Sequence, residues 1–313
     1  MPQYEDSRKR IEDLFVKNER ALQRSFERVR RFLDKNPQQL RQVEVLLDQG
    51  REAEAIERLV NSFAAQVGVT LKASFLLAGR ETTKYLEEVL NVLVVLDEAH
   101  PDVIRAINRQ ELALVQGLRD EQRLTLRRVL LDGRQRGVNP RQQARELGNA
   151  LGLTPRQQGA VDNYRALLEA GDPRAKRRHL HDARVKDVSN LSPGQIDRMV
   201  DNYQARMIRH RATVVARTEA LRATHEGAQA AYDQAVRDGV LRADDLGRKW
   251  HSASDARTRG HHASMHGQVR GTQEPFTSGL GNSLMYPGDI DAPAEDVIQC
   301  RCVVTTTFMT PES

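Results

Sequence analysis

Apolar residues recur at three- and four-residue steps through most of the chain, which is the period of an amphipathic helix. This pattern predicts a first helix from about Ser7 to Asn36, which ends at Asn36-Pro37 because the residue before proline avoids helical backbone angles. The same period predicts helices over 37–48, 52–67 and 71–98, and then one or two helices over 101–131.

Two further helices carry their own start signals. Asn139-Pro140 and Thr154-Pro155 each place an N-cap residue before a proline at the first helical position. We expect helices over 141–151 and from Thr154 to Ala170. Such a pair can present a recognition helix to DNA, or it can be simply two packed helices; the turn carries no feature specific to groove binding.

The pattern changes in the last third of the chain. A long helix is expected from Ser192-Pro193 to about Asp238, and short strands over 248–253, 267–270 and 297–308 surround a helix over 255–265. The fold class is therefore a mainly α N-terminal region of extended helices, followed by a small α+β C-terminal domain with a short antiparallel sheet. The expected divisions are a helical region over 1–131, a helical pair with a basic linker over 132–200, and the α+β domain over 201–313.

Composition supports packed helices, because only 4% of the 313 residues are aromatic and 29% are charged. The formal net charge of +5 does not by itself indicate a nucleic-acid partner. The most apolar run, 89–96, is shorter than the roughly 20 residues that cross a bilayer, and the N-terminus lacks a secretory signal pattern. We therefore expect a soluble protein without a membrane segment, from a reducing compartment because two cysteines do not make a disulfide framework.

Residues 171–192 form the most loop-like stretch, and they are rich in basic side chains. These are Arg174, Lys176, Arg177, Arg178, Arg184 and Lys186, with three aspartates among them. Clusters of this kind can contact the phosphates of double-stranded DNA without reading its sequence. A solvated linker explains the same composition, and both interpretations remain open.

Histidines and cysteines gather in the last seventy residues. On the expected helix, His262 and His266 are four residues apart and so share one face, while Cys300 and Cys302 point to one side of the expected strand. If that strand lies against the helix, these four residues could bind zinc. A disulfide between the two cysteines is not expected, because their Cα atoms in an extended strand would be about 6.6–6.8 Å apart with parallel side chains.

The alternative to zinc is a structural polar core, in which the cysteines are small buried hydrophobes. Its members would be Arg217, Glu219, Trp250, Asp255, Arg257, Thr258 and Arg301. Arg301 and Arg257 would then pair with an acidic residue to brace a small sheet. The usual hydrolase, phosphate-loop and metalloprotease motifs are missing from the sequence, so we assign no catalytic residue and expect no enzymatic activity.

Several short motifs occur in a familiar order between Asp201 and Phe308. They are Arg217-Thr218-Glu219, His225-Glu226-Gly227, Trp250, Asp255-x-Arg257-Thr258 with His262 and Gly267-Gln268, Tyr286-Pro287-Gly288-Asp289, and Cys300-Arg301-Cys302. In this order they resemble the phage Mu protein F-like family of minor head proteins. One position departs from the family, which usually has an acidic residue where His266 stands.

The resemblance implies a minor head protein of a tailed phage that acts in head morphogenesis. The implied location is the virion, inside the head near the portal vertex, after assembly in the host cytoplasm. The implied partners are the portal protein and the major capsid or scaffolding protein. In some members the implied role extends to genome packaging or ejection. Two rival hypotheses are a DNA-binding ejection protein and a zinc-dependent enzyme or toxin-carrier module.

Overall fold

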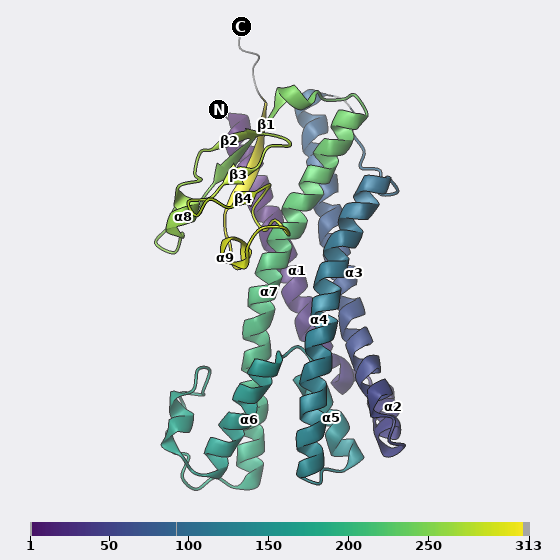
Figure 1. Cartoon of the computed structure of the whole chain (residues 1–313), viewed down its shortest axis with the longest axis vertical. Helices are drawn as coiled ribbons and strands as arrows, with labels where there is room; N and C mark the ends of the chain where they lie inside the picture. The colour runs from purple at the N-terminus through teal and green to yellow at the C-terminus, as the bar shows by residue number, and fades with distance from the viewer. Residues whose placement is uncertain (1, 92, 309–313) are drawn as a thin grey trace. The chain divides into compact units, whose positions relative to one another are not determined.

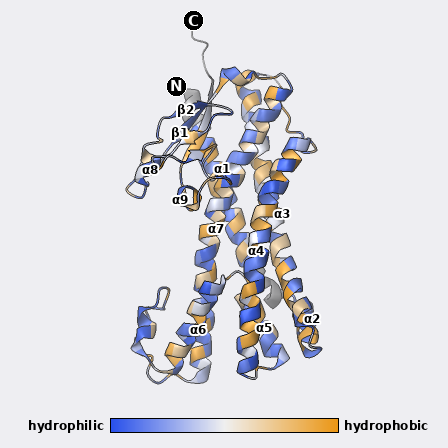
Figure 2. Ribbon diagram, in the orientation of Figure 1, coloured by the Kyte–Doolittle hydropathy of each residue, from blue (hydrophilic) through white to orange (hydrophobic). Residues whose placement is uncertain are grey.

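The computed structural model describes residues 2–91 and 93–308. Seven helices make up most of it: α1 (Pro2–Lys35), α2 (Pro37–Asp48), α3 (Glu52–Leu90), α4 (Pro101–Gln135), α5 (Pro140–Ala150), α6 (Pro155–Glu169) and α7 (Pro193–Arg237) (Figure 1). Apolar and polar residues alternate around these helices in Figure 2, as the helical period of the sequence requires. The expected fold class, long helices followed by a region with a short antiparallel sheet, is confirmed.

The remaining elements are short and lie mostly in the last seventy residues. They are the 3₁₀ turns η1 (Pro173–Arg177) and η2 (Ala243–Asp245), the strands β1 (Leu246–His251), β2 (Val269–Gly271), β3 (Phe276–Thr277), β4 (Ser283–Leu284) and β5 (Val303–Phe308), and the short helices α8 (Gly260–Ala263) and α9 (Ala294–Val297). One antiparallel sheet has the order β2-β1-β5, and β3 pairs with β4.

The predicted helix starts are confirmed at atomic level. Asn139 accepts a hydrogen bond from the backbone N–H of Gln142 at the start of α5. Thr154 and Gln157 form a reciprocal capping box at the start of α6. Side-chain oxygens thus satisfy backbone donors that the first turn of a helix leaves free.

The prediction of two separate helices over 52–67 and 71–98 is wrong, because α3 is one continuous helix that ends at Leu90. Its buried stripe continues through the glycine at position 68, from Val67 to Leu71 and Phe75, so packing outweighs the low helix propensity of glycine. Asn91 has a φ of 54°, the left-handed conformation that ends many helices.

The helix expected over 255–265 is also wrong, since only Gly260–Ala263 is helical. The carboxylate of Asp255 accepts hydrogen bonds from the backbone N–H of Arg257 and from the Thr258 hydroxyl, which folds this stretch into a turn. The closing strand begins at Val303 and not at Val297, because Ala294–Val297 forms α9 and Gln299 has a φ of 54°.

The chain divides into two compact units that interleave along the sequence. Unit 1 contains residues 1–22, 69–113 and 214–313, and unit 2 contains residues 23–68 and 114–213. Helices α1, α3, α4 and α7 contribute residues to both units. The three divisions expected from the sequence were consecutive, whereas each unit is assembled from separate segments.

The core of unit 1 lies between the sheet and helix α7. Strand β1 pairs with β5 so that Trp250 stands opposite Val304. Trp250 is fully buried and packs with Leu221 of α7, Phe276 and both cysteines, and Phe15 of α1 packs against the same cluster. The small sheet is therefore stable only against helices from distant parts of the chain.

The core of unit 2 is built by the helical pair and the start of α7. Tyr164 of α6 stacks on Tyr203 of α7 with ring centroids 4.2 Å apart. Gln122 of α4 is fully buried and bonds to the turn between α5 and α6, donating to the carbonyl of Leu153 (2.8 Å) and accepting from the N–H of Gly152 (2.9 Å). The helical pair is thereby fixed to α4.

Among the described residues, α3 is the helix long and apolar enough to cross a membrane by length and composition. Half of its most apolar window is buried inside the protein. The core helix of a globular protein passes the same test, so this feature gives little support to a membrane span.

Candidate functional site

Three sulfur and nitrogen side chains converge in unit 1. His262 lies in α8, and Cys300 and Cys302 lie in the connection between α9 and β5. The Nδ1 atom of His262 is 3.5 Å from the Sγ atom of Cys300 and 3.5 Å from that of Cys302. All three side chains are buried, and their three potential ligand atoms lie within 4.8 Å of one another. This part of the predicted cluster therefore forms, although neither the helix nor the strand that suggested it extends as expected.

Asp296 of α9 completes the arrangement from the far side of the imidazole. Its Oδ1 atom lies 3.2 Å from Nε2 of His262 and 3.3 Å from Nε2 of His261. The amide of Asn282 donates to its Oδ2 atom at 2.7 Å. The carboxylate, which is completely buried, thus favours a proton on Nε2 of His262 and leaves the Nδ1 lone pair directed at the thiols.

The two thiols are free and differ in their ease of ionisation. The pKa of Cys302 is lowered, first by a hydrogen bond from the Cys300 thiol and further by His262, whereas the same pairing together with burial raises the pKa of Cys300. The backbone N–H of Cys302 points at the sulfur of Cys300 at 3.4 Å. The pair can therefore carry one negative charge shared between the two sulfurs.

The structure does not bring His266 to this cluster. Its Nδ1 atom lies 3.2 Å from both the backbone N and the Oγ of Ser252, and its ring packs edge-on against His251. Asp296 does contact the cluster, but the sequence pattern did not predict it as a site residue. No motif spacing marks Asp296, because it meets His262 through the fold alone.

The residues predicted to form a structural polar core separate into two groups. In the first, Arg301 pairs with both carboxylate oxygens of Asp255 (2.5 and 2.6 Å), while Arg257 is more distant at 3.9 Å. The guanidinium of Arg301 holds the pKa of Asp255 well below its usual range. The turn at Asp255, which includes Thr258, is thereby tied to the cysteine segment.

The second group lies on α7. Arg217 pairs with Glu19 of α1 at 3.0 Å, and Glu219 pairs with Arg222 at 3.1 Å. Burial raises the pKa of Glu219, and the neighbouring Arg222 opposes that effect. The first pair joins α7 to α1. The second lies within α7, where Arg222 also donates to the carbonyl of Gly288 at 2.8 Å.

A cavity of about 170 Å³ opens beside the histidine and cysteines. His262, Cys300 and Cys302 line it together with four arginines, which are Arg217, Arg257, Arg259 and Arg301. None of the described residues that line it is acidic. Its electrostatic character therefore favours an anion.

A family model described as phage Mu protein F-like protein matches residues 125–305, which is more than half of the chain. The chain belongs to the phage Mu protein F-like family. The match spans the histidine–cysteine cluster, the polar core and the basic loop. No curated protein and no solved structure matches the chain. Membership places this Mu F-like protein among phage head morphogenesis proteins.

The basic loop of the Mu F-like protein is folded and belongs to unit 2. Its six basic side chains are exposed, while Ala175 and Val188 anchor the loop in the core beside α6. Arg174 pairs with Asp172, and Arg184 pairs with Asp182. The Nζ atom of Lys176 donates to the carbonyl of Lys186 at 3.2 Å, so the two sides of the loop meet.

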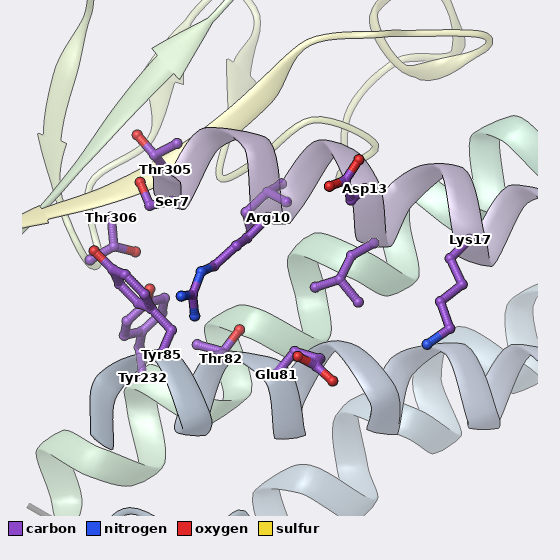
Figure 3. A pocket seen from close by; sticks show the side chains of 12 residues that line it. Ser7, Arg10, Asp13, Lys17, Glu81, Thr82, Tyr85, Tyr232, Thr305 and Thr306 are labelled. Carbon is purple, nitrogen blue, oxygen red and sulfur yellow. The ribbon is translucent and has the colours of Figure 1, made fainter. Parts of the chain in front are cut away.

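A second cavity, of about 260 Å³, lies in unit 1 between α1, α3, α7 and β5 (Figure 3). Arg10 reaches into it over the ring of Tyr85 and pairs with Glu88. Tyr232 faces the same space, and burial raises the pKa of its hydroxyl. This cavity shares no lining residue with the arginine-lined one.

A third cavity, of about 540 Å³, is lined in part by carboxylate side chains of α7. Glu226 and Asp233 line it with Tyr286. Burial raises the pKa of Glu226 to about 7 and also raises the pKa of Asp233. The Oε2 atom of Glu226 is buried and has no hydrogen-bond partner among the described residues. Deprotonation of Glu226 therefore costs the folded protein free energy.

Proposed function

We propose that this Mu F-like protein is a minor head protein that binds the portal protein inside the head and acts in head assembly. The family match over residues 125–305 is the observation that carries the proposal. The packing of unit 1 supports a scaffold role, because segments from both ends of the chain build one core around Trp250. Paired charges, such as Arg301 with Asp255, brace that core.

The linker between α3 and α4 offers a surface for the portal protein. Leu93 and Val95 are 73% and 64% exposed, while Val94 between them and Leu96 after them are buried. The side chain of Gln234 fixes this extended segment to α7, donating to the carbonyl of Val95 and accepting from the N–H of Asp97, both at 2.9 Å. Two large apolar side chains are thus held outward on an ordered backbone, as in many protein interfaces.

The test uses the full chain and the portal protein encoded by the same phage genome. Co-expression and affinity purification should recover a complex of the two, and mass spectrometry of purified virions should detect the chain. A phage that lacks the gene should produce defective heads, and a plasmid copy should restore them. Normal, infectious heads without the gene, or virions without the protein, would refute the proposed function.

Substitutions then test the surface. Replacing Leu93 and Val95 with serine should weaken the complex with portal protein, whereas Val69→Ser, at an exposed position on α3, should not. Equal binding by both variants would show that the portal protein contacts another surface of the chain, and it would leave the portal interaction itself standing. Circular dichroism of each variant checks that its helical content is preserved.

A second candidate function is contact with the packaged genome, and the basic loop favours it. Six exposed basic side chains lie on an ordered loop whose two sides are joined by the Lys176–Lys186 contact. Arg174 and Arg184 already pair with adjacent aspartates, so Lys176 and Arg177 should contribute more to phosphate binding than those two arginines.

Duplex DNA binding measured against salt concentration tests this second candidate. Affinity should fall steeply as salt rises, and the slope should decrease by about 1 for each phosphate contact removed. Lys176→Gln with Arg177→Gln should weaken binding more than Arg174→Gln with Arg184→Gln. Binding that is absent, or that does not depend on salt, would eliminate this candidate.

A further inference from the structure

The geometry points to a zinc site made by Nδ1 of His262 and the Sγ atoms of Cys300 and Cys302, with its fourth coordination position open to the arginine-lined cavity. One nitrogen and two thiolate sulfurs form a ligand set that zinc prefers. The site depends on no particular partner protein, so it stands apart from the proposed role in the head.

The distances match those of a tetrahedral ion. With Zn–S near 2.3 Å and Zn–N near 2.0–2.1 Å, a tetrahedral arrangement separates a sulfur from a nitrogen ligand by about 3.5–3.6 Å. The two observed separations from Nδ1 of His262 are both 3.5 Å. All three ligand atoms fall within 4.8 Å of one another, so one ion can reach them together.

The surroundings of the ligands fit zinc as well. Metal-binding histidines commonly donate their other ring N–H to a carboxylate, which fixes the ring and raises its basicity. Asp296 accepts from Nε2 of His262 in this way at 3.2 Å, and it is completely buried. The backbone N–H of Cys302 points at the sulfur of Cys300, and such a donor stabilises a metal-bound thiolate.

An unpartnered donor lies at the same place. The indole N–H of Trp250 is buried without a hydrogen-bond partner among the described residues. Trp250 packs in one buried cluster with Cys300 and Cys302. A zinc-bound thiolate would accept from this indole, whereas the ordinary explanation of a small apolar cysteine leaves the N–H unsatisfied.

The fourth position is left to a water molecule or a small oxyanion. His261 does not belong to the ligand group, because its Nε2 atom lies 3.3 Å from Oδ1 of Asp296 and groups with that carboxylate and His262, without the two cysteines. The cavity of about 170 Å³ adjoins all three ligands, and four arginines but no carboxylate line it. Two of these arginines, Arg217 and Arg301, pair with Glu19 and Asp255, so a net positive charge remains. Such a position attracts an oxyanion like phosphate.

Elemental analysis of the full-length protein gives the first test. After dialysis against a weak chelator, we expect one zinc per chain. Cys300→Ser, Cys302→Ser and His262→Ala should each lose it. Asp296→Asn keeps the three ligands and should weaken zinc binding about 10- to 100-fold, because it removes the carboxylate that orients the ring of the His262 ligand. His266→Ala, a nearby histidine outside the cluster, is the matched control and should retain full zinc.

Cobalt substitution tests the geometry and the open position in the unaltered chain. Cobalt should give the intense visible bands of a tetrahedral site and thiolate charge-transfer bands, and inorganic phosphate should shift the visible bands. Wild-type protein with neither bound zinc nor these cobalt bands would overturn the site. Cobalt bands that do not respond to phosphate, together with loss of metal in His261→Ala, would show a closed site and overturn the open position.

Discussion

Gly227 of α7 lies directly against the carbonyl oxygen of Phe75, at the point where α7 crosses α3. A Cβ atom placed on Gly227 would lie 2.3 Å from that oxygen and 3.1 Å from the Cβ of Ala78. Gly79 faces it in turn, since a Cβ there would meet the carbonyl of Gly227 at 3.2 Å. Glycine is therefore required at position 227 because the two backbones lie too close for a Cβ atom. The φ angle of Gly227 is one that other residues also adopt.

Gly227→Ala should accordingly destabilise unit 1. Overpacking of a close contact costs about 1–3 kcal/mol, because backbone cannot move aside as a flexible side chain does. Urea unfolding followed by circular dichroism measures this loss. Gly117→Ala in α4 is the control, since nothing lies within 4 Å of its added Cβ, and it should stabilise the protein by up to about 1 kcal/mol. Equal effects of both substitutions would contradict the close crossing.

The raised pKa of Glu226 makes stability depend on pH. The folded protein holds this proton more tightly than the unfolded chain, with a pKa of about 7 against the ordinary 4.5. Its contribution is therefore fully present below about pH 4.5 and is lost as the pH rises through 7. Glu226→Gln should be more stable than the wild type at pH 8, by up to about 3 kcal/mol, and little different at pH 4.

Thermal unfolding between pH 4 and pH 8 checks the Glu226 prediction. The wild-type Tm should fall relative to that of Glu226→Gln across this range. Glu87→Gln, at an exposed position of α3, controls for the loss of a charge and should follow the wild type. Parallel pH profiles for wild type and Glu226→Gln would show that this carboxyl is not protonated in the folded state.

The ion pair between Asp255 and Arg301 should contribute a modest coupling energy. Its side chains are 41% and 22% exposed, so solvent screens the pair, and a double-mutant cycle with alanine should give a small favourable coupling. The lowered pKa of Asp255 makes this contribution present above the ordinary pKa of aspartate and lost as the pH falls below it. The more exposed pair of Arg51 with Glu54, at the start of α3, should couple less.

Gln122→Leu should destabilise unit 2 by about 1–3 kcal/mol. The substitution keeps the side-chain volume but leaves the buried N–H of Gly152 without its acceptor. The carbonyl of Leu153 keeps a second donor, the hydroxyl of Thr125. Gln142→Leu, at an exposed position of α5, is the control for adding an apolar residue. Chemical unfolding that gives the same stability for both variants would contradict this role of Gln122.

The sequence predicted those parts of the fold that depend on local chemistry. Proline at the first helical position marked the starts of α2, α5 and α6, and Asn139 and Thr154 also cap their helices, because capping acts within four residues. An aspartate such as Asp255 can cap a helix or, as here, accept from the backbone N–H two residues on and form a turn, and the local pattern fits both. The carboxylate is also held by Arg301, which is 46 residues away. Local pattern carries no information about such a contact.

The candidate site shows the same division. The pairing of His262 with Cys300 and Cys302 was predicted from unusual residue types close to the C-terminus, although the secondary structure behind it was wrong. His266 was included because a helix would have placed it one turn beyond His262, and that helix ends at Ala263. Asp296 could not be found, because an aspartate in a polar stretch becomes notable only when a fold buries it.

The interleaved make-up of unit 1 has a consequence for the newborn chain on the ribosome. Phe15 is translated long before the Trp250 cluster against which it packs, and that cluster is completed only by Cys300, Cys302 and Val304. The part of α1 around Phe15 is therefore covered by this cluster only after residues up to Val304 have been translated. A fragment that starts at residue 201 would lack Phe15 and would expose to solvent the part of the Trp250 cluster that Phe15 covers.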